Sequence, residues 1–430
     1  MASNTIRLGT ASPGTQATKA ATLEQLALLA RRAASQRIDL LLLPEAYIGG
    51  YPRGTHFGSV IGERSHAGRE EYARYFEAAV DLGDTTGEGG GGAGDAWVKR
   101  QLGGDDSEES RRGDGTREEL ERIAAETGVF LVVGLIERAG GTLYCAVVYV
   151  CPREGTLGKR RKVMPTGTER LCWGQGSPST LRAVSTTIRG VRVNLAAAIC
   201  WENYMPLLRQ ALYAQNVNLY LAPTADNRDA WLALMRTVAV EGRCFVVTSN
   251  MCQRDDSHGT TTATTNNMTS AAAAAPPPSR RRNSTITAEG NEIALPAASA
   301  SSGSPSRRRR RSVFDVDGNE IVLCDSTTPE PAGPPTAAAV TPAVNGDMTP
   351  RKTAGVAPGW LSRGGSAIVS PYGDVLAGPQ WEDSEGLVWE DVDFRECIKG
   401  RLDLDAAGSY SRNDSFKFSV SGLNLDPLPY

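Results

Sequence analysis

Short apolar runs alternate with amphipathic segments of helical period through residues 1–250 of the chain. A strand buried on both faces is a continuous apolar run, whereas a surface helix repeats its apolar residues every three or four positions. These patterns predict strands at 6–10, 38–43, 129–135, 145–151, 191–199, 217–222 and 243–248, and later at 364–370, near 375 and at 387–392. They predict helices at 22–36, 63–82, 117–127, 207–215 and 227–241. This alternation predicts an α/β fold with one mixed sheet or a pair of sheets.

Several helix boundaries carry their own signals. Thr22 and Thr116 are each followed three residues later by Gln or Glu, which is the spacing of a capping box. We therefore expect Thr22, Thr116 and Asn227 to cap helices, and Gly128 and Gly242 to end two of them.

Two long stretches follow neither pattern. Residues 84–115 are rich in Gly, Asp and Glu, and residues 254–358 in Thr, Ala, Pro, Ser and Arg. Because neither composition can bury a core of its own, we interpret 84–115 as a flexible insertion and 254–358 as a disordered low-complexity insertion. One exception, 312–324, has the pattern of a hairpin around Asp317-Gly318.

Three reactive side chains stand at or just beyond strand ends. Glu45 follows the second predicted strand, and Cys200 follows the fifth, where a sharp turn precedes a helix. Lys162 lies in an irregular segment, 158–176, that begins with a basic run and then carries Pro, Gly and Trp. Pockets in α/β folds collect at the carboxyl ends of strands, so these positions favour one shared site. The alternatives are a buried apolar cysteine, a solvent-facing glutamate and a solvated basic face.

Composition narrows the function classes. The 430 residues are 40% hydrophobic and 22% charged, with a net charge of −3, which suffices for one large core or two modest ones. This balance argues against a protein built to bind nucleic acid or an anionic membrane. The Arg runs 280–282 and 307–311 leave a non-catalytic regulatory or nucleic-acid-binding protein as the rival interpretation. Those runs have no interleaved aromatic residues and no folded module around them, which disfavours it.

Cysteine and histidine usage points away from disulfides and metals. The eight cysteines form no CxxC pair, and the three histidines form no pair at ligand spacing. We expect free thiols in a reducing, cytoplasmic compartment, with no metal and no cofactor. No apolar run is long enough to span a membrane, and the first residues lack the pattern of a signal peptide, so we expect neither.

A thiol is a weak nucleophile until a base or a cation converts it to thiolate. No histidine lies near Cys200 in the sequence, so a Cys–His mechanism has little support. Glu45 as the base and Lys162 as the stabiliser of developing negative charge could do the same work.

Three motifs resemble the nitrilase superfamily, within it the nitrilase and cyanide hydratase branch, and especially filamentous-fungal nitrilases. They are PEAYIGGYP around Glu45, RKVMPTGTER around Lys162 and CWENYMPLLR around Cys200. The resemblance covers nearly all of the ordered chain. It places the family's catalytic glutamate, lysine and cysteine on these three residues, and a further glutamate that positions the lysine on Glu169.

The resemblance implies an α-β-β-α sandwich formed by residues 1–416, interrupted by the two insertions and followed by a C-terminal arm, 417–430. It also implies cofactor-free hydrolysis of a nitrile to a carboxylic acid and ammonia through a covalent Cys200 intermediate. A nitrile- or cyanide-hydrating enzyme that releases the amide, and an amidase of the same superfamily, remain alternatives. Dimers that build into a spiral are the expected assembly.

Substrate-binding candidates and departures complete the interpretation. Tyr51, Thr166, Trp173 and Trp201 are expected to shape the substrate pocket, with ordinary packing as the alternative for each. The family usually has Gly four residues before the nucleophile, where this chain has Ala196, which questions the local backbone geometry. A basic-aromatic GHYxRP signature near the end of family members reads GSYSRN at 408–413, which questions subunit contacts rather than chemistry.

Overall fold

The computed structural model describes residues 5–52, 64–86, 113–254 and 359–423, and the backbone of four short strands between 284 and 323. The chain divides into two units, one made of 1–259 and 350–430 and the other of 260–349. Each unit is described by itself below.

Two sheets form the centre of the larger unit, and within the described residues each has seven strands. The first runs in the order β18-β1-β2-β4-β5-β6, with β3 beside β4; its strands are β1 (Thr5–Ala11), β2 (Leu40–Leu42), β3 (Val80–Asp81), β4 (Phe130–Ala139), β5 (Thr142–Cys151), β6 (Gly155–Arg161) and β18 (Leu387–Asp393). The second runs in the order β11-β16-β10-β9-β8-β7, with β17 beside β16; its strands are β7 (Val184–Ile188), β8 (Val191–Ala197), β9 (Leu219–Thr224), β10 (Phe245–Asn250), β11 (Cys252–Arg254), β16 (Trp360–Val369) and β17 (Val375–Trp381). Both are mixed: β1, β2, β3 and β4 form parallel pairs, as do β8, β9 and β10, while the remaining strands pair antiparallel.

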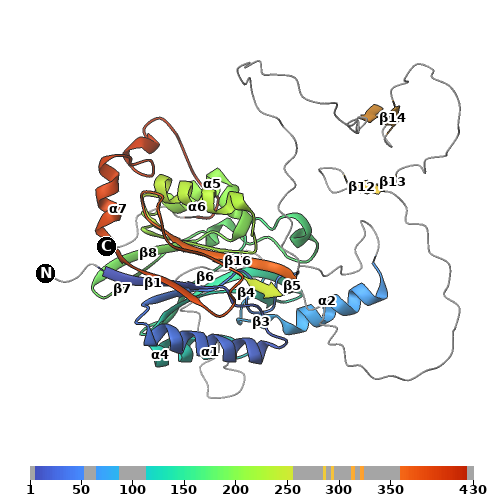
Figure 1. Ribbon diagram of the computed structural model, residues 1–430, viewed down its shortest axis with the longest axis horizontal. Coiled ribbons are helices and arrows are strands. Elements are labelled where there is room, and N and C mark those ends of the chain that lie inside the picture. The colour runs from blue at the N-terminus through green and yellow to red at the C-terminus, as the bar shows by residue number, and fades with distance from the viewer. Residues whose placement is uncertain are drawn as a thin grey trace, which may run out of the picture. The chain divides into compact units, whose positions relative to one another are not determined.

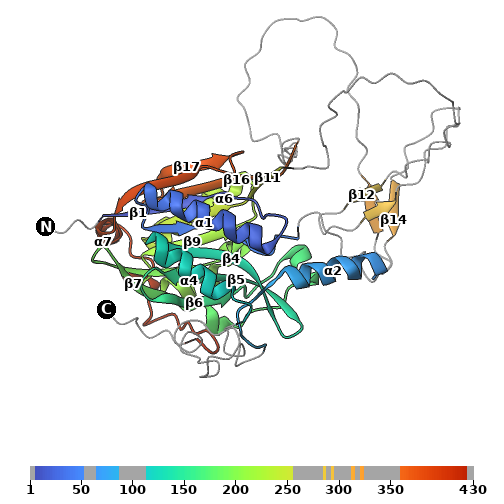
Figure 2. The same cartoon turned by 90° about the horizontal axis from the view of Figure 1, so that it is seen from below.

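Helices cover the outer face of each sheet. Figures 1 and 2 show α1 (Lys19–Ser35) and α4 (Thr116–Thr127) on one side of the stacked sheets, and Figure 1 shows α5 (Pro206–Tyr213) and α6 (Asp229–Gly242) on the other. The four layers confirm the predicted α-β-β-α sandwich. Two more helices of the described residues, α2 (His66–Ala78) and α7 (Arg395–Lys399), lie outside these layers (Figure 1).

The continuous apolar runs of the sequence explain the stacking. Successive side chains of a strand point to opposite faces, so an all-apolar strand can pack against two layers at once. In β9, Leu219 and Leu221 join the core between the sheets, while Tyr220 and Ala222 pack against the α5–α6 layer. Ala196, where the family has Gly, is buried in that same helix-facing core and pairs regularly with Tyr220. The strand leading to Cys200 is therefore undistorted there.

The first helix starts one turn earlier than predicted. Its N-cap is Thr18, whose side-chain oxygen accepts a hydrogen bond from Ala21 N at 3.1 Å. Thr22 lies inside the helix, buried, and its hydroxyl donates to Thr18 O at 3.0 Å. The predicted cap at Thr22 is wrong, because a Thr hydroxyl can bond back to the carbonyl four residues earlier.

The second predicted capping box also does not form. Gly115 is the N-cap of α4 and makes no side-chain cap hydrogen bond, and Thr116 is the first helical residue. Asp114 Oδ1 accepts from Thr116 N at 3.1 Å and so takes the capping role. The predicted stop at Gly128 is confirmed, in the left-handed conformation with φ 71°.

Helix α6 is displaced by one residue at each end. Asp226 Oδ1 accepts from Arg228 N at 3.0 Å, and this local turn makes Arg228 rather than Asn227 the N-cap. The helix includes Gly242 and ends at Arg243, with φ 46°. The side chain of Arg243 holds this position by donating to two distant backbone carbonyls, those of Leu404 and Pro371.

The smaller unit contains two antiparallel pairs, β12 (Ser284–Ile286) with β13 (Glu292–Ala294) and β14 (Arg311–Phe314) with β15 (Glu320–Leu323). The antiparallel β14–β15 pair agrees with the strands of the hairpin predicted in 312–324, and its predicted turn at Asp317-Gly318 lies outside the described residues. The rest of the predicted insertion 254–358 from residue 255 onwards, and residues 87–112 of the predicted insertion 84–115, lie outside the described residues.

No helix in the described ranges is long and apolar enough to cross a membrane. After α7 the described tail carries two short 3₁₀ turns, η6 (Gly400–Leu402) and η7 (Ser409–Ser411), the second within the GSYSRN segment. Further on, Phe418, Val420 and Leu423 are partly buried against the α5–α6 core. The part of the predicted arm that the structure describes therefore packs on the body.

Candidate active site

Cys200 stands where the chain leaves β8 and turns sharply. Its φ is +54°, a left-handed conformation that non-glycine residues adopt at a cost of about 1–3 kcal/mol. The 3₁₀ turn η4 (Cys200–Tyr204) and α5 follow directly, so the elbow lifts the thiol out of a rigid sheet. The thiol is buried, and Thr224 Oγ1, at the end of neighbouring β9, donates to Cys200 Sγ at 3.2 Å.

Glu45 leaves β2 at the facing edge of the first sheet. The next residue, Ala46, is also left-handed, with φ 53°, which turns the chain across β4. Gly134 of β4 permits the crossing, because a Cβ there would lie 2.1 Å from Pro44 O and 2.9 Å from Glu45 Cα. The Glu45 side chain is completely buried.

Lys162 is the last of four basic residues that the sequence left open to interpretation as a solvated face. All four are buried, and the first three belong to β6 rather than to an irregular loop. Strand alternation explains why: Lys159 and Arg161 pair with Glu137 on one side, while Arg160 and Lys162 reach into the space between the sheets. The solvated-face alternative is therefore wrong.

Glu169 shares the Lys162 ammonium with Glu45. Lys162 Nζ donates to Glu45 Oε1 at 2.7 Å and to Glu169 Oε1 at 2.9 Å. Glu169 is itself fixed, since Tyr51 Oη donates to its Oε1 and Thr166 N to its Oε2, each at 2.8 Å. The structure thus brings five of the predicted site residues together.

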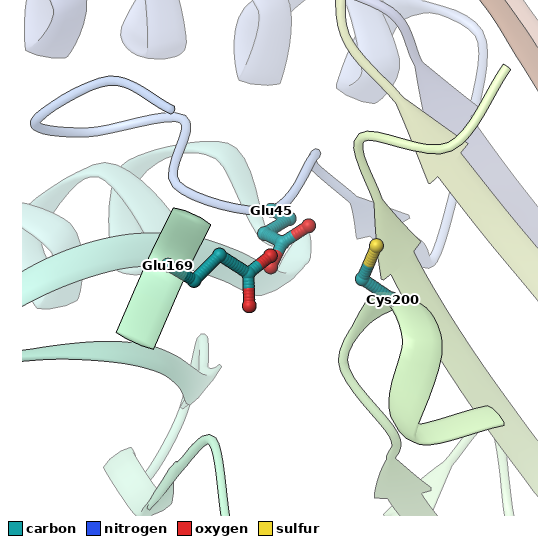
Figure 3. Close-up of side chains that lie close together, drawn as sticks. All are labelled: Glu45, Glu169 and Cys200. Carbon is teal, nitrogen blue, oxygen red and sulfur yellow. The ribbon is translucent and has the colours of Figure 1, made fainter. Parts of the chain in front are cut away.

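The thiol faces the two carboxylates across a small gap (Figure 3). One ligand atom from each of Glu45, Glu169 and Cys200 lies within 4.8 Å of the others. Figure 3 shows the two carboxylate oxygens of Glu45 on different sides, one toward Glu169 and one toward Cys200. Three such groups could in principle bind a cation, but the Lys162 ammonium already supplies positive charge between the carboxylates. We assign no metal here.

Burial and charge set the protonation of the site. Burial raises the pKa of Glu45 to about 7, although the Lys162 ammonium opposes the rise. Burial and the neighbouring Glu45 raise the pKa of the Cys200 thiol. The attraction of Glu45 and the other nearby acidic groups outweighs burial for Lys162, whose pKa is raised well above its usual value. At neutral pH the resting site therefore holds a protonated thiol, an ammonium and a base poised to exchange a proton.

Comparison with known proteins identifies the chain's relatives. Residues 5–276 match the carbon-nitrogen hydrolase family, whose model spans more than half of the chain. A nitrilase of Bradyrhizobium diazoefficiens is 34% identical over 398 residues, covering 92% of this chain and 86% of the relative. The chain belongs to the carbon-nitrogen hydrolase family. An arylacetonitrilase of the fungus Trametes versicolor is 32% identical over 407 residues, covering 93% of this chain and 91% of the relative.

The fold of this carbon-nitrogen hydrolase agrees with solved members. A carbon-nitrogen hydrolase from Helicobacter pylori G27 superposes with a TM-score of 0.52 at 12% identity, covering 95% of this chain and 97% of that one. This likeness concerns the fold; the family match and the nitrilase relatives confirm the resemblance to the nitrilase superfamily and the enzyme class.

A buried ion pair that sequence reasoning missed connects the two halves of the hydrolase site. Glu202 Oε1 accepts from Arg160 Nη2 and from Val163 N, each at 2.7 Å. Glu202 Oε2 accepts from Ile199 N at 2.8 Å. One carboxylate thus ties the backbone just after Lys162 to the residue just before Cys200. Its place in the CWEN motif, two residues after the nucleophile, was the available signal.

The two predicted tryptophans occupy different positions in the hydrolase. Trp173 is buried, with Lys162 Nζ 5.6 Å from its ring centroid, and its indole N donates to Tyr75 Oη of α2 at 3.1 Å. Trp201 is 39% exposed, and its indole N donates to Asp226 Oδ2 at 3.0 Å. Trp173 therefore packs on the lysine side of the site, and Trp201 stands at the surface beside the nucleophile.

Tyr75 was also not predicted, because it lies within a charged amphipathic helix that gives no sign of contact with a site. Thr224 could have been found, since it ends a buried strand in the same way as the residues that were predicted.

Proposed function

We propose that this enzyme hydrolyses nitriles to carboxylic acids and ammonia, with Cys200 as nucleophile, Glu45 as general base and acid, and Lys162 as stabiliser of negative charge. The observation that carries the proposal is the arrangement of Glu45. Its Oε1 is held by Lys162 at 2.7 Å, while its buried Oε2 has no hydrogen-bond partner among the described residues. A buried polar atom without a partner is rare, and this one is available to receive a proton from a thiol or a water.

In the first step the sulfur of Cys200 attacks the nitrile carbon, and the thiol proton passes to Glu45. The C≡N bond becomes C=N, and Glu45 returns the proton to that nitrogen, giving a thioimidate. In this proposal Lys162 stabilises the charge that develops on the nitrogen during attack. The raised carboxyl pKa of about 7 makes Glu45 a stronger base toward the thiol than an ordinary carboxylate.

Water then completes the reaction in two further steps. A first water, deprotonated by Glu45, adds to the thioimidate carbon, and Glu45 passes this proton to the nitrogen. The tetrahedral intermediate then expels ammonia, which takes up the proton of the added hydroxyl, to leave a thioester. A second water adds in the same way and expels the Cys200 sulfur, which regains its proton, and the carboxylic acid leaves. If the first tetrahedral intermediate expels sulfur instead of ammonia, the product is the amide.

The remaining site residues take supporting roles in this proposal. Tyr51 and Thr166 hold Glu169, which in turn positions the Lys162 ammonium. Trp173 and Trp201 are proposed to contact the substrate, one beside the lysine and the other beside the nucleophile.

Product analysis tests the proposal. The purified enzyme is incubated with aliphatic nitriles, aryl nitriles, arylacetonitriles and cyanide, and with the matching amides, and acid, amide and ammonia are quantified by mass spectrometry and ammonia assay. We expect equimolar acid and ammonia from at least one nitrile, and none from Cys200→Ala. Turnover of amides alone would show an amidase, and release of amide alone would show a hydrating enzyme; either would overturn the proposal.

A further inference from the structure

A second buried thiol touches the base. Cys145 lies on β5, which packs in the core between the sheets, and is completely buried. Its Sγ is 3.6 Å from Glu45 Oε1, the same oxygen that receives the Lys162 ammonium. Its backbone carbonyl accepts from Lys162 N at 2.7 Å. Cys145 therefore contacts both partners of the acid–base pair.

This thiol can only donate toward the carboxylate. An ionised carboxylate offers acceptors and no donor, so the S–H proton is the one available for the contact. Burial and the neighbouring Glu45 raise the pKa of Cys145 well above its usual value, so the proton stays on the sulfur. Cys145 lacks the sharp left-handed turn of Cys200, because it sits in the middle of a regular antiparallel ladder opposite Ile136.

We propose that Cys145 is a positioning residue for Glu45: its thiol and Lys162 together hold Oε1, which leaves Oε2 free for proton transfer. This inference rests on the proposed function, in which Glu45 is the base. Two donors on one oxygen fix the plane of the carboxyl group. With Lys162 alone, the carboxyl group could still rotate about the axis of the hydrogen bond between Oε1 and the Lys162 ammonium.

The contact also affects the protonation of Glu45. A hydrogen bond to the ionised form favours that form, so removing the thiol raises the pH at which Glu45 loses its proton. The titratable groups that face Glu45 from the surrounding elements are Lys162, Glu169, Cys200, Cys145, Tyr51 and Tyr75. Of these groups only Cys145 changes in Cys145→Ala and Cys145→Ser, so the direction of the shift is attributable to it.

The test compares pH profiles of kcat/KM for the unmodified enzyme, Cys145→Ala, Cys145→Ser and Cys151→Ala. Serine keeps a hydroxyl donor, and alanine does not. Cys151 is the matched control, because it is buried at the end of the same strand, in the same core, with its Sγ near Glu154. Each profile is measured with the substrate that the product analysis identifies.

We expect Cys145→Ala to move the acid limb of the profile upward by roughly half a unit to one unit, with a several-fold lower kcat, since S–H is a weak donor. Cys145→Ser should restore the limb toward that of the unmodified enzyme. Cys151→Ala should lower the melting temperature while leaving the limb in place, as expected for a lost core contact. An unchanged limb in Cys145→Ala, or equal shifts in the Ala and Ser variants, would overturn the proposal.

A comparison of Glu45→Gln with the unmodified enzyme distinguishes failure of the Cys145 proposal from failure of the proposed function. If Glu45→Gln retains full activity, Glu45 is not the base and the proposed function fails. If Glu45→Gln is inactive while the Cys145 variants behave alike, only the positioning role fails.

Discussion

At the scale of single residues, the depth at which Glu45 is buried should determine how the reaction responds to pH. Its pKa is raised to about 7 because burial penalises the charged form, and the base must be ionised to accept the thiol proton. We therefore expect kcat/KM to fall about tenfold per unit as pH decreases below about 7. A profile measured between pH 5 and 9 checks this. An acid limb near pH 4.5, the ordinary value for a glutamate, would contradict it.

Lys162 makes a second prediction at this scale. Its ammonium is the one buried cation in contact with both site carboxylates among the described residues. Lys162→Ala should reduce kcat at least about a hundredfold, the usual cost of removing a positioned charge stabiliser. Glu169→Gln should have a smaller effect, because it weakens the positioning of the lysine and keeps its charge. Steady-state ammonia release measures both. Equal losses would mean that Glu169 has a more direct role.

The three catalytic candidates could be predicted from the sequence because each follows a strand or sits in a distinctive motif. Glu202 had a signal in its motif position, but its pairing with Arg160 could not be predicted, since a buried ion pair between residues 42 positions apart leaves no periodic trace. Cys145 was equally invisible, because a cysteine within an apolar strand has the pattern of an ordinary core residue.

At the scale of elements, Glu202 joins β6 to the nucleophile's turn, and its loss should be costly. Glu202→Ala leaves the Arg160 guanidinium buried without its carboxylate, at a cost of about 3–5 kcal/mol. The control is Glu126→Ala, which removes an exposed partner of Arg122 on α4 and should cost about 1 kcal/mol or less. Urea denaturation measures both free energies of unfolding. Similar losses in the two variants would contradict a bracing role for Glu202.

Elements were predicted more reliably than their ends. The strands and helices of the sandwich follow from apolar runs and helical period, which tertiary packing reinforces. The side chains that set the helix starts are those of Thr18, Asp114 and Asp226. The sequence offers other residues of capping type close to each of them, so it could not show which one makes the contact. Strand β6 was missed because its basic residues are neutralised by acidic partners from distant parts of the chain, Asp84, Glu137 and Glu202, which local composition cannot show.

At the scale of the whole molecule, the long insertion interrupts two adjacent strands. Arg254 at the end of β11 pairs with Trp360 at the start of β16, in an antiparallel ladder. A short turn can join such neighbours, so we propose that 257–357 is dispensable for folding. Replacing it with a Gly-Ser turn should leave the melting temperature within a few degrees and preserve ammonia release. Loss of folding would show that the insertion belongs to the core.

We also propose that the enzyme assembles into dimers that extend into a spiral, and that the tail contributes to this. Light scattering of the full chain and of a form ending at Phe416 should show a smaller assembly for the shorter form. Because Phe418, Val420 and Leu423 pack on the α5–α6 core, some loss of stability is expected as well. A stable monomer of the full chain at micromolar concentration would exclude the assembly.

The identity of the covalent intermediate tests the central claim most directly. A slowly hydrolysed nitrile is mixed with the enzyme, quenched in acid during turnover, and the adduct is located by peptide mass mapping. The proposed mechanism predicts a thioimidate or thioester mass on the peptide that carries Cys200, and no adduct in Cys200→Ala. An adduct on Cys145 or any other cysteine, or undiminished ammonia release by Cys200→Ala, would contradict it.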